Sequence, residues 1–478
     1  MNYYDLLLAR NLANKGDITT ESLSVTANGT YSEQGKAYSP VNVNVPLGTK
    51  SITQNGTYDA EDDDLKGYSS VEVNVPNKYV YGFHINGNES DPDKMVTYLE
   101  DAIGMTPAHM DYTNDVFDYG SWSDIWFIKY LKPCILGQDG TVIKYLDKND
   151  YSKDVDGNTV DIGGTLADAN VMIEFPKIFY KIVPDVGDST SASVYFSPFK
   201  LDDGYHDYAY INYQGIHKEH FYLAAYNSST ISNTLRSLSG QTTTKTKSLN
   251  GTTEISYAEA NGNGWSIEHN GMITLVNLLL VLMGKSTNTQ AVYGQGLVDS
   301  GTEAINNSFP TGIHNAKGLF YGTNSGTAST YTNAVKVFGI ENWWGFIWNR
   351  YYGDMLVNGV TKTKYCYGKE DGSTTDSFNT TGEGYITTST PTPTGTSGQY
   401  CIAAHWDSNG FSTYSTNSST GSASKYYCDG LWFSNSGSHV AYRGGRSHNG
   451  ALCGAFFRAA SDAVSLAAWT LAARIAYI

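Results

Sequence analysis

The chain has 478 residues, of which only 16% are charged, and its formal net charge is -16. Nucleic-acid binding depends on a basic surface, so this acidic balance excludes that class of protein. Tyr (37 residues) and Gly (49 residues) are abundant, and the low charge favours β-structure with long polar loops over a helical enzyme. The length is sufficient for two or three domains.

Five cysteines are scattered along the chain, and none forms the C-x-x-C pair of a zinc or redox motif. Because the count is odd, we expect mostly free, buried thiols, with one or two disulfides as the alternative. The five are Cys134, Cys366, Cys401, Cys428 and Cys453.

No targeting or membrane-spanning segment is predicted. Residues 1–5 lack a basic n-region, and the apolar residues 6–9 are too short for a signal h-region. The longest apolar run, residues 273–283, is interrupted by Thr274 and Asn277 and is too short to cross a bilayer. We therefore expect no membrane insertion, synthesis in a cytoplasm, and arrival at any surface by assembly.

A short helix is predicted within residues 1–16, because Tyr4, Leu7, Leu8 and Leu12 have helical spacing. Such a short helix is marginal alone and needs a packing partner. We interpret it as an assembly or attachment element; a frayed terminus is the alternative.

Residues 17–77 contain two copies of one pattern. Each copy has Asn-Gly-Thr-Tyr, beginning at Asn28 or Asn55, and then a Val-x-Val-x-Val run that stops at Pro46 or Pro76. Asn-Gly indicates a tight turn, and the alternation indicates a strand with one buried face. Each unit is too small for its own core, so we predict two β-repeat spacer units that stack on neighbours. The copies resemble repeats of phage tail-associated proteins; two independent hairpins in a linker are the alternative.

A larger domain is predicted over residues 78–478. Hydrophobic periodicity predicts both helices and strands in it, and Ser/Thr-rich stretches predict loops. The expected elements are a helix at 94–103, strands at 171–182, 208–211 and 221–226, a loop at 227–252, a long helix at 265–284 ended by Gly284, and a loop insertion at 370–398.

Three sequence features follow one another along this domain. They are Trp265 with the long helix, a loop containing Gly294 and Gly296, and the run Glu341-Asn342-Trp343-Trp344-Gly345-Phe346-Ile347-Trp348. This order resembles the C-type-lectin-like fold of formylglycine-generating-enzyme relatives, whose strand reads Glu-(Asn/Met)-x-x-Gly-Asn-Val-Trp-Glu-Trp. Here Phe346 replaces the Asn, and Asn349-Arg350 replaces the final Glu-Trp. We expect the three tryptophans, Trp343, Trp344 and Trp348, to pack in the core.

The resemblance implies an α+β fold. The expected architecture is a C-type-lectin-like domain with long insertions, preceded by small β-repeat modules and a short N-terminal helix.

Residues 440–478 have ordered ends and an irregular middle. Arg443-Gly444-Gly445 predicts a turn, because paired glycines adopt backbone conformations closed to other residues, and residues 475–478 predict a short apolar strand. The residue types between them follow no single period, and small Gly and Ala residues are interspersed. An ordinary hydrophobic C-terminal hairpin is one interpretation.

The other interpretation rests on Arg443-Gly444-Gly445 and on Trp469-Thr470-Leu471-Ala472-Ala473-Arg474. Together they resemble the opening turn and closing strand of the variable region in proteins diversified by a retroelement, of which the major tropism determinant of phage tails is the best-known type. Ala472 stands where that family usually has Gly. Diversification at adenines of asparagine-type codons cannot generate Lys, Glu, Gln, Met or Trp, and residues 430–478 contain no Lys, Glu, Gln or Met.

The resemblance implies that the side chains between the two motifs bind a ligand. Leu452, Phe457 and Leu466 are expected to be exposed apolar anchors, although burial of each in the core is the alternative. Polar and small members add adaptable hydrogen bonds at low entropic cost. The predicted ligand-binding residues are Arg446, His448, Asn449, Leu452, Phe457, Ala459, Ser461, Asp462, Leu466, Ala468 and Thr470.

No catalytic or cofactor site is predicted. Cys428 and Cys453 resemble no reactive copper-site pair, and Cys453 lies in the irregular segment, so we expect no oxidase activity. His206, His217 and His220 with nearby aspartates match no metal-site spacing, and the acidic residues 61–64 are expected to form a solvated turn. We therefore expect neither a metal nor another cofactor.

The expected function is that of a phage tail receptor-binding protein, made in the host cytoplasm and carried on the virion. Its partners would be a bacterial surface receptor, either protein or glycan, and other phage tail proteins. The resemblance further implies a homotrimer, since multivalency raises a low intrinsic affinity. The alternatives are a bacterial surface-display adhesin of the same fold and a tail-bound glycan-degrading enzyme.

Overall fold

The computed structural model describes the backbone of six short strands within residues 23–73 and then residues 79–478, except 165, 167, 242–247, 299–308, 328–330, 365–377 and 389–391; the side chains of 411–415 are also left out. Strands form 38% of the chain and helices 13%, with one sheet curled into a half-barrel. The fold is therefore mixed and mostly β, which agrees with the α+β class at this level. The helix predicted within residues 1–16 lies outside the described residues.

The two repeat copies form hairpins of identical register. Strand β2 (Gly29–Tyr31) pairs with β3 (Val41–Val43), and β5 (Gly56–Tyr58) pairs with β6 (Val71–Val73); in both hairpins the Gly faces the later Val and the Tyr faces the earlier one. The strands that precede β2 and β5, namely β1 (Leu23–Val25) and β4 (Lys50–Ile52), pair antiparallel with Ser24 opposite Ser51. Ser24 and Ser51 are equivalent positions, so the two copies meet about a local twofold axis.

A six-stranded sheet combines strands from the whole length of the larger domain. Its fifth strand, β31, comes from the last residues and lies between β16 and β19, with antiparallel pairing on both sides. The strand predicted at residues 475–478 is thus confirmed. The sheet order is β12 (Val142–Tyr145), β11 (Lys132–Gly137), β13 (Ala169–Phe175), β16 (Phe221–Ala224), β31 (Ile475–Tyr477), β19 (Trp265–Ile267).

The helix predicted at residues 94–103 is wrong, because these residues belong to a four-stranded antiparallel sheet. Residues 94–103 contain strand β8, in which Val96 and Tyr98 are buried and Thr97 is exposed. The alternation of β-branched and aromatic residues therefore prevailed over the helical spacing of Met95, Leu99 and Ile103. The order is β14 (Phe179–Asp185), β15 (Asp188–Ser197), β7 (Tyr81–Ile85), β8 (Val96–Glu100).

The largest sheet has nine strands and contains most of the C-terminal segment. Strands β27 and β29 pair in parallel, as do β22 and β30, and the remaining neighbours are antiparallel. The order is β24 (Ile386–Thr387), β23 (Val360–Thr363), β22 (Trp348–Val357), β28 (Ser438–Gly444), β29 (Gly454–Asp462), β27 (Gly430–Phe433), β25 (Gln399–Asp407), β26 (Phe411–Ser418), with β30 (Leu471–Ala473) on β22.

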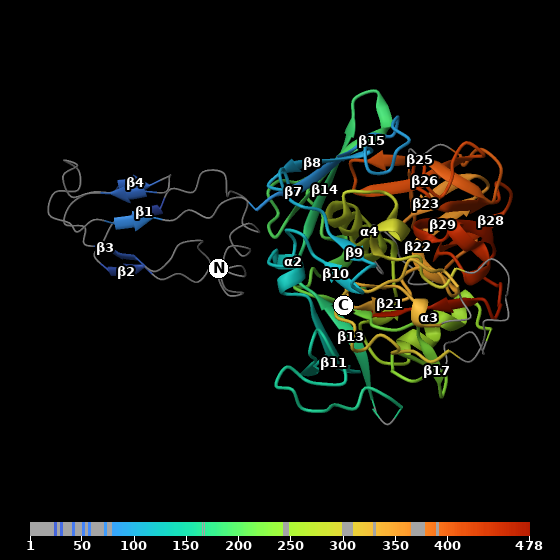
Figure 1. Cartoon of the computed structure of the whole chain (residues 1–478), viewed down its shortest axis with the longest axis horizontal. Helices are drawn as coiled ribbons and strands as arrows, with labels where there is room; N and C mark the ends of the chain where they lie inside the picture. The colour runs from blue at the N-terminus through green and yellow to red at the C-terminus, as the bar shows by residue number, and fades with distance from the viewer. Residues whose placement is uncertain are drawn as a thin grey trace.

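Helix α4 (Asn270–Gly284) lies at the centre of the molecule (Figure 1). Every residue of α4 after Asn270 is buried, because the helix is apolar on all sides. It ends at Gly284 as predicted, but it starts later than residue 265, since Trp265–Ile267 form β19. Figure 1 shows β7, β8 and β14 on one side of α4 and the nine-stranded sheet on the other.

The remaining elements are short. Residues 208–211 contain a 3-10 turn, Tyr208–Tyr210, and not the predicted strand, because Tyr210 N–H donates to the Asp207 carbonyl 2.9 Å away. The predicted loop at 227–252 contains a hairpin. The other elements are α2 (Trp126–Lys129), α3 (Gly251–Glu259), α5 (Thr289–Tyr293) and the hairpins β9 (His109–Asp111)–β10 (Val116–Asp118), β17 (Ser229–Ile231)–β18 (Thr234–Arg236) and β20 (Lys336–Val337)–β21 (Ile340–Glu341).

Within the described ranges, no helix has the length and apolar character needed to cross a bilayer.

Asp207 connects two segments through buried charge. It forms an ion pair with Lys177, and His217 Nδ1 lies 2.9 Å from both of its carboxylate oxygens. Burial opposes ionisation of Asp207, but His217 and Lys177 outweigh it and hold its pKa at about 2. Because this pKa is depressed below the unfolded value, the stabilisation is complete above pH 4 and is lost as pH falls through about 2.

We expect Asp207→Asn to lower the free energy of unfolding by about 2 kcal/mol at pH 7, a deficit that disappears towards pH 2. Urea titrations of both proteins at pH 7, 4, 3 and 2 measure the difference. Asp203→Asn is the matched control, since the Asp203 side chain is fully exposed; it should leave the curve unchanged. If Asp207→Asn lowered the free energy of unfolding by the same amount at every pH, the lowered pKa assigned to Asp207 would be contradicted.

Candidate functional site

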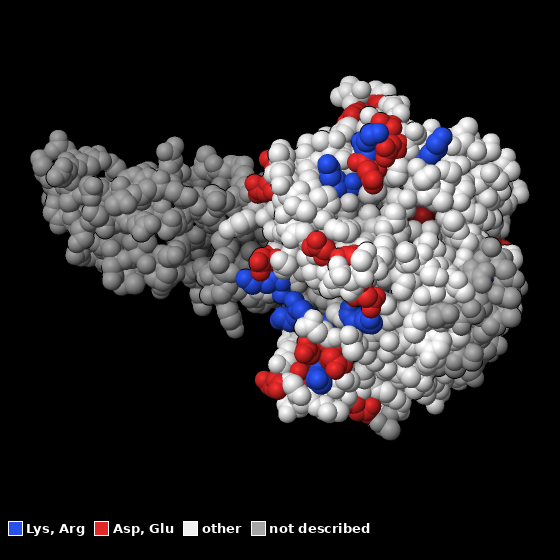
Figure 2. Space-filling model, viewed as in Figure 1, with Lys and Arg blue, Asp and Glu red and all other residues white. Residues whose placement is uncertain are grey.

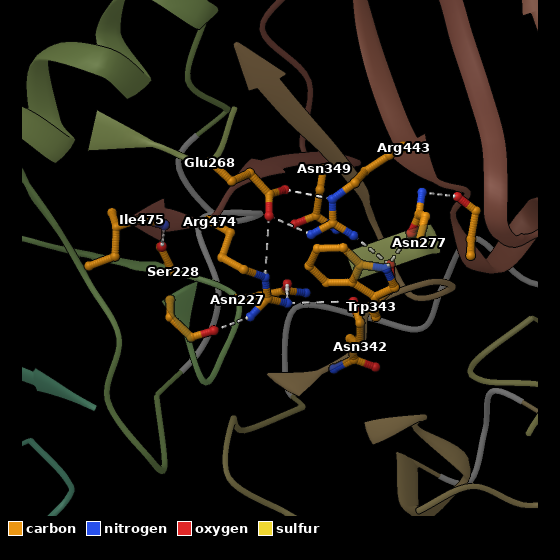
Figure 3. Close-up of polar contacts among 12 residues, drawn as sticks. Asn227, Ser228, Glu268, Asn277, Asn342, Trp343, Asn349, Arg443, Arg474 and Ile475 are labelled. Carbon is orange, nitrogen blue, oxygen red and sulfur yellow. Dashed lines mark hydrogen bonds and ion pairs between the residues drawn. The ribbon is translucent and has the colours of Figure 1, made fainter. Parts of the chain in front are cut away.

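The turn predicted at Arg443-Gly444-Gly445 is wrong, because Arg443 and Gly444 are the last residues of strand β28, which is buried there and held by an ion pair (Figure 3). Arg443 Nε and Nη2 donate to the two oxygens of Glu268 at 2.7 and 2.6 Å, and Nη1 donates to the Trp343 carbonyl at 2.6 Å. The guanidinium also lies 3.5 Å from the centre of the Trp343 ring. A bidentate pair fixes both distance and orientation, so Arg443 locks β28 onto the start of α4.

Gly444 is required at the same point. Its φ is +80°, and a Cβ there would lie 2.8 Å from the Trp343 carbonyl oxygen. Trp343 in turn donates through its indole N–H to Asn277 of α4 at 2.9 Å. Trp343 and Trp344 are fully buried, as the sequence predicted.

Arg474 holds the closing strand in a comparable manner. Its side chain is completely buried and lies between β30 and β31. It donates to the Ala224 carbonyl at 2.8 Å, to Asn227 Oδ1 at 2.6 Å and to the Glu341 carbonyl at 2.7 Å (Figure 3). Both ends of residues 443–474 are therefore anchored in the interior.

Trp348, at the start of β22, connects the two halves of the intervening segment. Its indole N–H donates to Asn449 Oδ1 at 2.9 Å, and the Arg446 guanidinium lies 4.4 Å from the ring centre. Its backbone N–H donates to the Thr470 carbonyl at 3.1 Å. Residues from 446–449 and from 470 therefore lie around one partly exposed tryptophan.

Asn449 also accepts a hydrogen bond from the Arg446 backbone N–H at 2.9 Å, so its amide closes the turn at η5 (Ser447–Leu452). We expect Asn449→Ala to lower the free energy of unfolding by about 1–2 kcal/mol, because two donors lose their acceptor. Chemical denaturation followed by tryptophan fluorescence measures this. His448→Ala, at the exposed neighbouring position, is the control and should change stability by less than about 0.5 kcal/mol.

The predicted ligand-binding residues fall into three groups by exposure. His448 is exposed. Three members are buried, and the expectation that they are accessible is wrong; they are Phe457, Ala459 and Thr470. The partly exposed members are Arg446, Asn449, Leu452, Ser461, Asp462, Leu466 and Ala468.

The burial of Phe457 and Ala459 follows from their position in β29. This strand is interior to the nine-stranded sheet, and both of its faces are covered. Phe456 packs in the cluster that contains α4, whereas Phe457 packs on the opposite face with its ring 5.0 Å from that of Trp432. The anchor predicted at Phe457 is thus part of the core.

Residues 463–470 form the cover over that second face. The backbone N–H of Gly251 donates to the Val464 carbonyl at 3.0 Å, and Arg350 Nη2 donates to the Leu466 carbonyl at 2.8 Å. Arg350 also forms a fully buried ion pair with Glu254 of α3. The segment is therefore fixed through its carbonyl oxygens, while Ala463, Ser465, Ala467 and Trp469 face outward.

A hollow of about 530 Å³ opens beside the η5 turn. Gly450 and Ala451 form part of its wall, so it lies next to the segment that the sequence singled out. Four carboxamide side chains from elsewhere in the chain also line it; they are Asn288, Gln290, Gln295 and Asn324. No sequence pattern identified these residues. Asn288, Gln290 and Gln295 lie in and beside the short helix α5, and the fold brings Asn324 and the η5 turn next to them.

Among the described residues, no two cysteines form a disulfide bond. Cys134, Cys401, Cys428 and Cys453 are free and buried, and burial raises the pKa of the Cys453 thiol well above its usual range. Cys366 lies outside the described residues. The described part of the chain also contains no group of three or more His, Cys, Asp or Glu side chains arranged to hold a metal ion.

No protein-family model matches the chain, and no curated protein matches it in sequence.

Proposed function

We propose that the chain is a phage tail receptor-binding protein whose C-terminal segment binds a bacterial cell-surface ligand. One observation carries the proposal: the two motifs at the ends of residues 443–474 are anchored in the interior, whereas residues 446–452 and 461–469 reach the surface between them. Such an arrangement tolerates substitutions at the surface without loss of the fold. It is the property that a diversified binding segment needs.

The C-type-lectin-like fold over residues 78–478 is part of this proposal. It is supported by the encased helix α4, the glycine turn at residues 294–296, and the Trp343-Trp344-Gly345 turn that leads into β22. The resemblance to retroelement-diversified proteins supports assignment of residues 440–478 as the variable region.

The attachment and assembly roles belong to the same proposal. Residues 1–16 would attach the chain to other tail proteins, residues 17–77 would act as a spacer, and three copies would associate on the virion. Analytical ultracentrifugation at micromolar concentration measures the oligomeric state directly. A monomer there would contradict the homotrimer.

The binding role is tested by changing surface side chains that the fold does not use. We expect the double variant His448→Ala/Leu452→Ala to reduce binding of the fluorescently labelled protein to host cells at least tenfold, since a few side chains near the centre of an interface carry most of the binding energy. The thermal midpoint should stay within a few degrees of the wild type. Val186→Ser, at a fully exposed apolar residue on the β14–β15 turn, is the matched control. Unchanged cell binding by the double variant would exclude η5 from the binding surface.

A further inference from the structure

The hollow beside η5 has walls that are held in place by hydrogen bonds. Gln290 Nε2 donates to the Cys453 carbonyl at 2.6 Å, and Asn288 Nδ2 donates to the Ala423 carbonyl at 3.1 Å. The Tyr112 hydroxyl donates to the Ala291 carbonyl at 3.0 Å. These bonds join four distant stretches of the chain, so the hollow is formed before any ligand arrives.

Other polar groups in the hollow remain available. The side-chain amides of Gln295 and Asn324 make no hydrogen bond to any residue that the structure describes, and both side chains are at least partly exposed. A carboxamide offers two N–H donors and a carbonyl acceptor. The hollow therefore presents donors and acceptors side by side.

The described lining contains no Asp, Glu, Lys, Arg or His. A phosphate or carboxylate ligand would need a cationic partner, and a cationic ligand would need a carboxylate. The wider surroundings agree, because Figure 2 shows charged side chains gathered over the N-terminal half of the larger domain and an almost uncharged surface over β22 to β29. The chemistry of the hollow suits a neutral ligand.

We propose that this hollow binds an uncharged saccharide unit of a cell-surface glycan, an inference that deepens the receptor-binding function proposed above and rests on it. Each sugar hydroxyl both donates and accepts a hydrogen bond, which is the complement of a carboxamide. The half-buried Tyr112 supplies an aromatic surface at the wall, and a hollow of about 530 Å³ lies in the range of small-ligand sites. Because Gly450 and Ala451 belong to the C-terminal segment, substitutions in that segment would change which sugar fits.

Ala451 offers a direct test, since it is exposed on the wall of the hollow and its side chain is small. Purified full-length protein is applied to an array of neutral and anionic oligosaccharides that includes host wall polysaccharide. We expect binding to neutral saccharides only, and a loss of at least tenfold in Ala451→Trp, whose indole fills the hollow. Ala467→Trp is the matched control, because Ala467 is exposed in the same C-terminal segment but does not line the hollow; it should bind as the wild type does.

Two sets of outcomes separate this inference from the function on which it rests. Binding to no neutral saccharide, preference for anionic saccharides, or unchanged binding by Ala451→Trp would overturn the saccharide assignment. If the wild type nevertheless binds host cells, the receptor-binding function survives with a ligand of another class. If the array shows neutral saccharide binding but host cells bind no protein, the receptor-binding proposal fails and the hollow remains a saccharide site.

Discussion

Arg443→Ala is expected to lower the free energy of unfolding by about 3–5 kcal/mol. The substitution leaves Glu268 completely buried without its bidentate partner, and it also removes the cation from the face of Trp343. Arg474 Nε remains 3.9 Å from Glu268 Oε2, beyond hydrogen-bond distance, so the buried carboxylate loses its bidentate hydrogen bonds and is only partly compensated. A domain with a typical stability of about 5–15 kcal/mol would lose a large part of its margin.

Urea denaturation at pH 7 measures this loss. Lys94→Ala is the matched control, because it removes an ion pair with Asp91 in which the Lys94 side chain is 72% exposed; it should cost at most about 1 kcal/mol. The double variant Arg443→Met/Glu268→Met is expected to be more stable than Arg443→Met alone, since both charges leave together. A change below about 1 kcal/mol in Arg443→Ala would show that the buried pair does not hold the end of β28.

Arg350→Ala is expected to cost a similar amount, about 3–5 kcal/mol, and to release residues 463–470 as well. Arg350 neutralises Glu254 and simultaneously holds the Leu466 carbonyl, so one side chain stabilises both α3 and the segment that covers Phe457. Loss of the cover exposes apolar surface without unfolding the sheet. Limited digestion with chymotrypsin, followed by mass spectrometry, should show rapid cleavage at Leu466 and Trp469 in the variant and slow cleavage in the wild type.

The same variant has a pH dependence of defined sign. Burial raises the pKa of Glu254 to about 7, and Arg350 opposes that rise. A carboxyl group whose folded pKa is raised contributes stability that is complete below its unfolded value, near pH 4.5, and is lost as pH rises through about 7. Without Arg350 the charged form of Glu254 is still less favourable. The loss in free energy of unfolding caused by Arg350→Ala should therefore be larger at pH 8 than at pH 5. Equal deficits at the two values would mean that Glu254 does not titrate in the folded protein.

The closing strand of the C-terminal segment was predictable from the sequence, and its opening and middle were not. The apolar run at 475–478 predicted the short strand β31, whereas Arg443 and Gly444, predicted as a turn, end strand β28 with a φ of +80° at Gly444. Phe457 alternates with Phe456 along β29, and alternation alone does not tell which face is covered. The cover at residues 463–470 is tied down by Arg350 and Gly251, whose positions depend on the whole fold.

Helix α4 was also predicted only in part from the sequence, and the hollow was not predicted at all. The helix ended by Gly284 was predicted from the helical spacing of Met272, Leu275, Leu278 and Leu279. Its predicted start at residue 265 was wrong, because Trp265–Ile267 form β19. The hollow lay beyond any local pattern, since Tyr112, Asn288 and Ala451 meet only after the sheets have formed. Uncharged polar residues are common in loops, so the residues that line the hollow can be recognised only from their proximity in the folded structure.

The position of β31 between β16 and β19 has a consequence during synthesis. The ribosome makes residues 475–477 after every other strand of that sheet, so the sheet stays open until they emerge. A reading frame interrupted by a stop codon anywhere in residues 440–470 yields a product without β30 and β31, and cellular proteases remove chains that stay unfolded. Under the proposed function, gene copies damaged during diversification of this segment would be eliminated as protein before a particle is assembled.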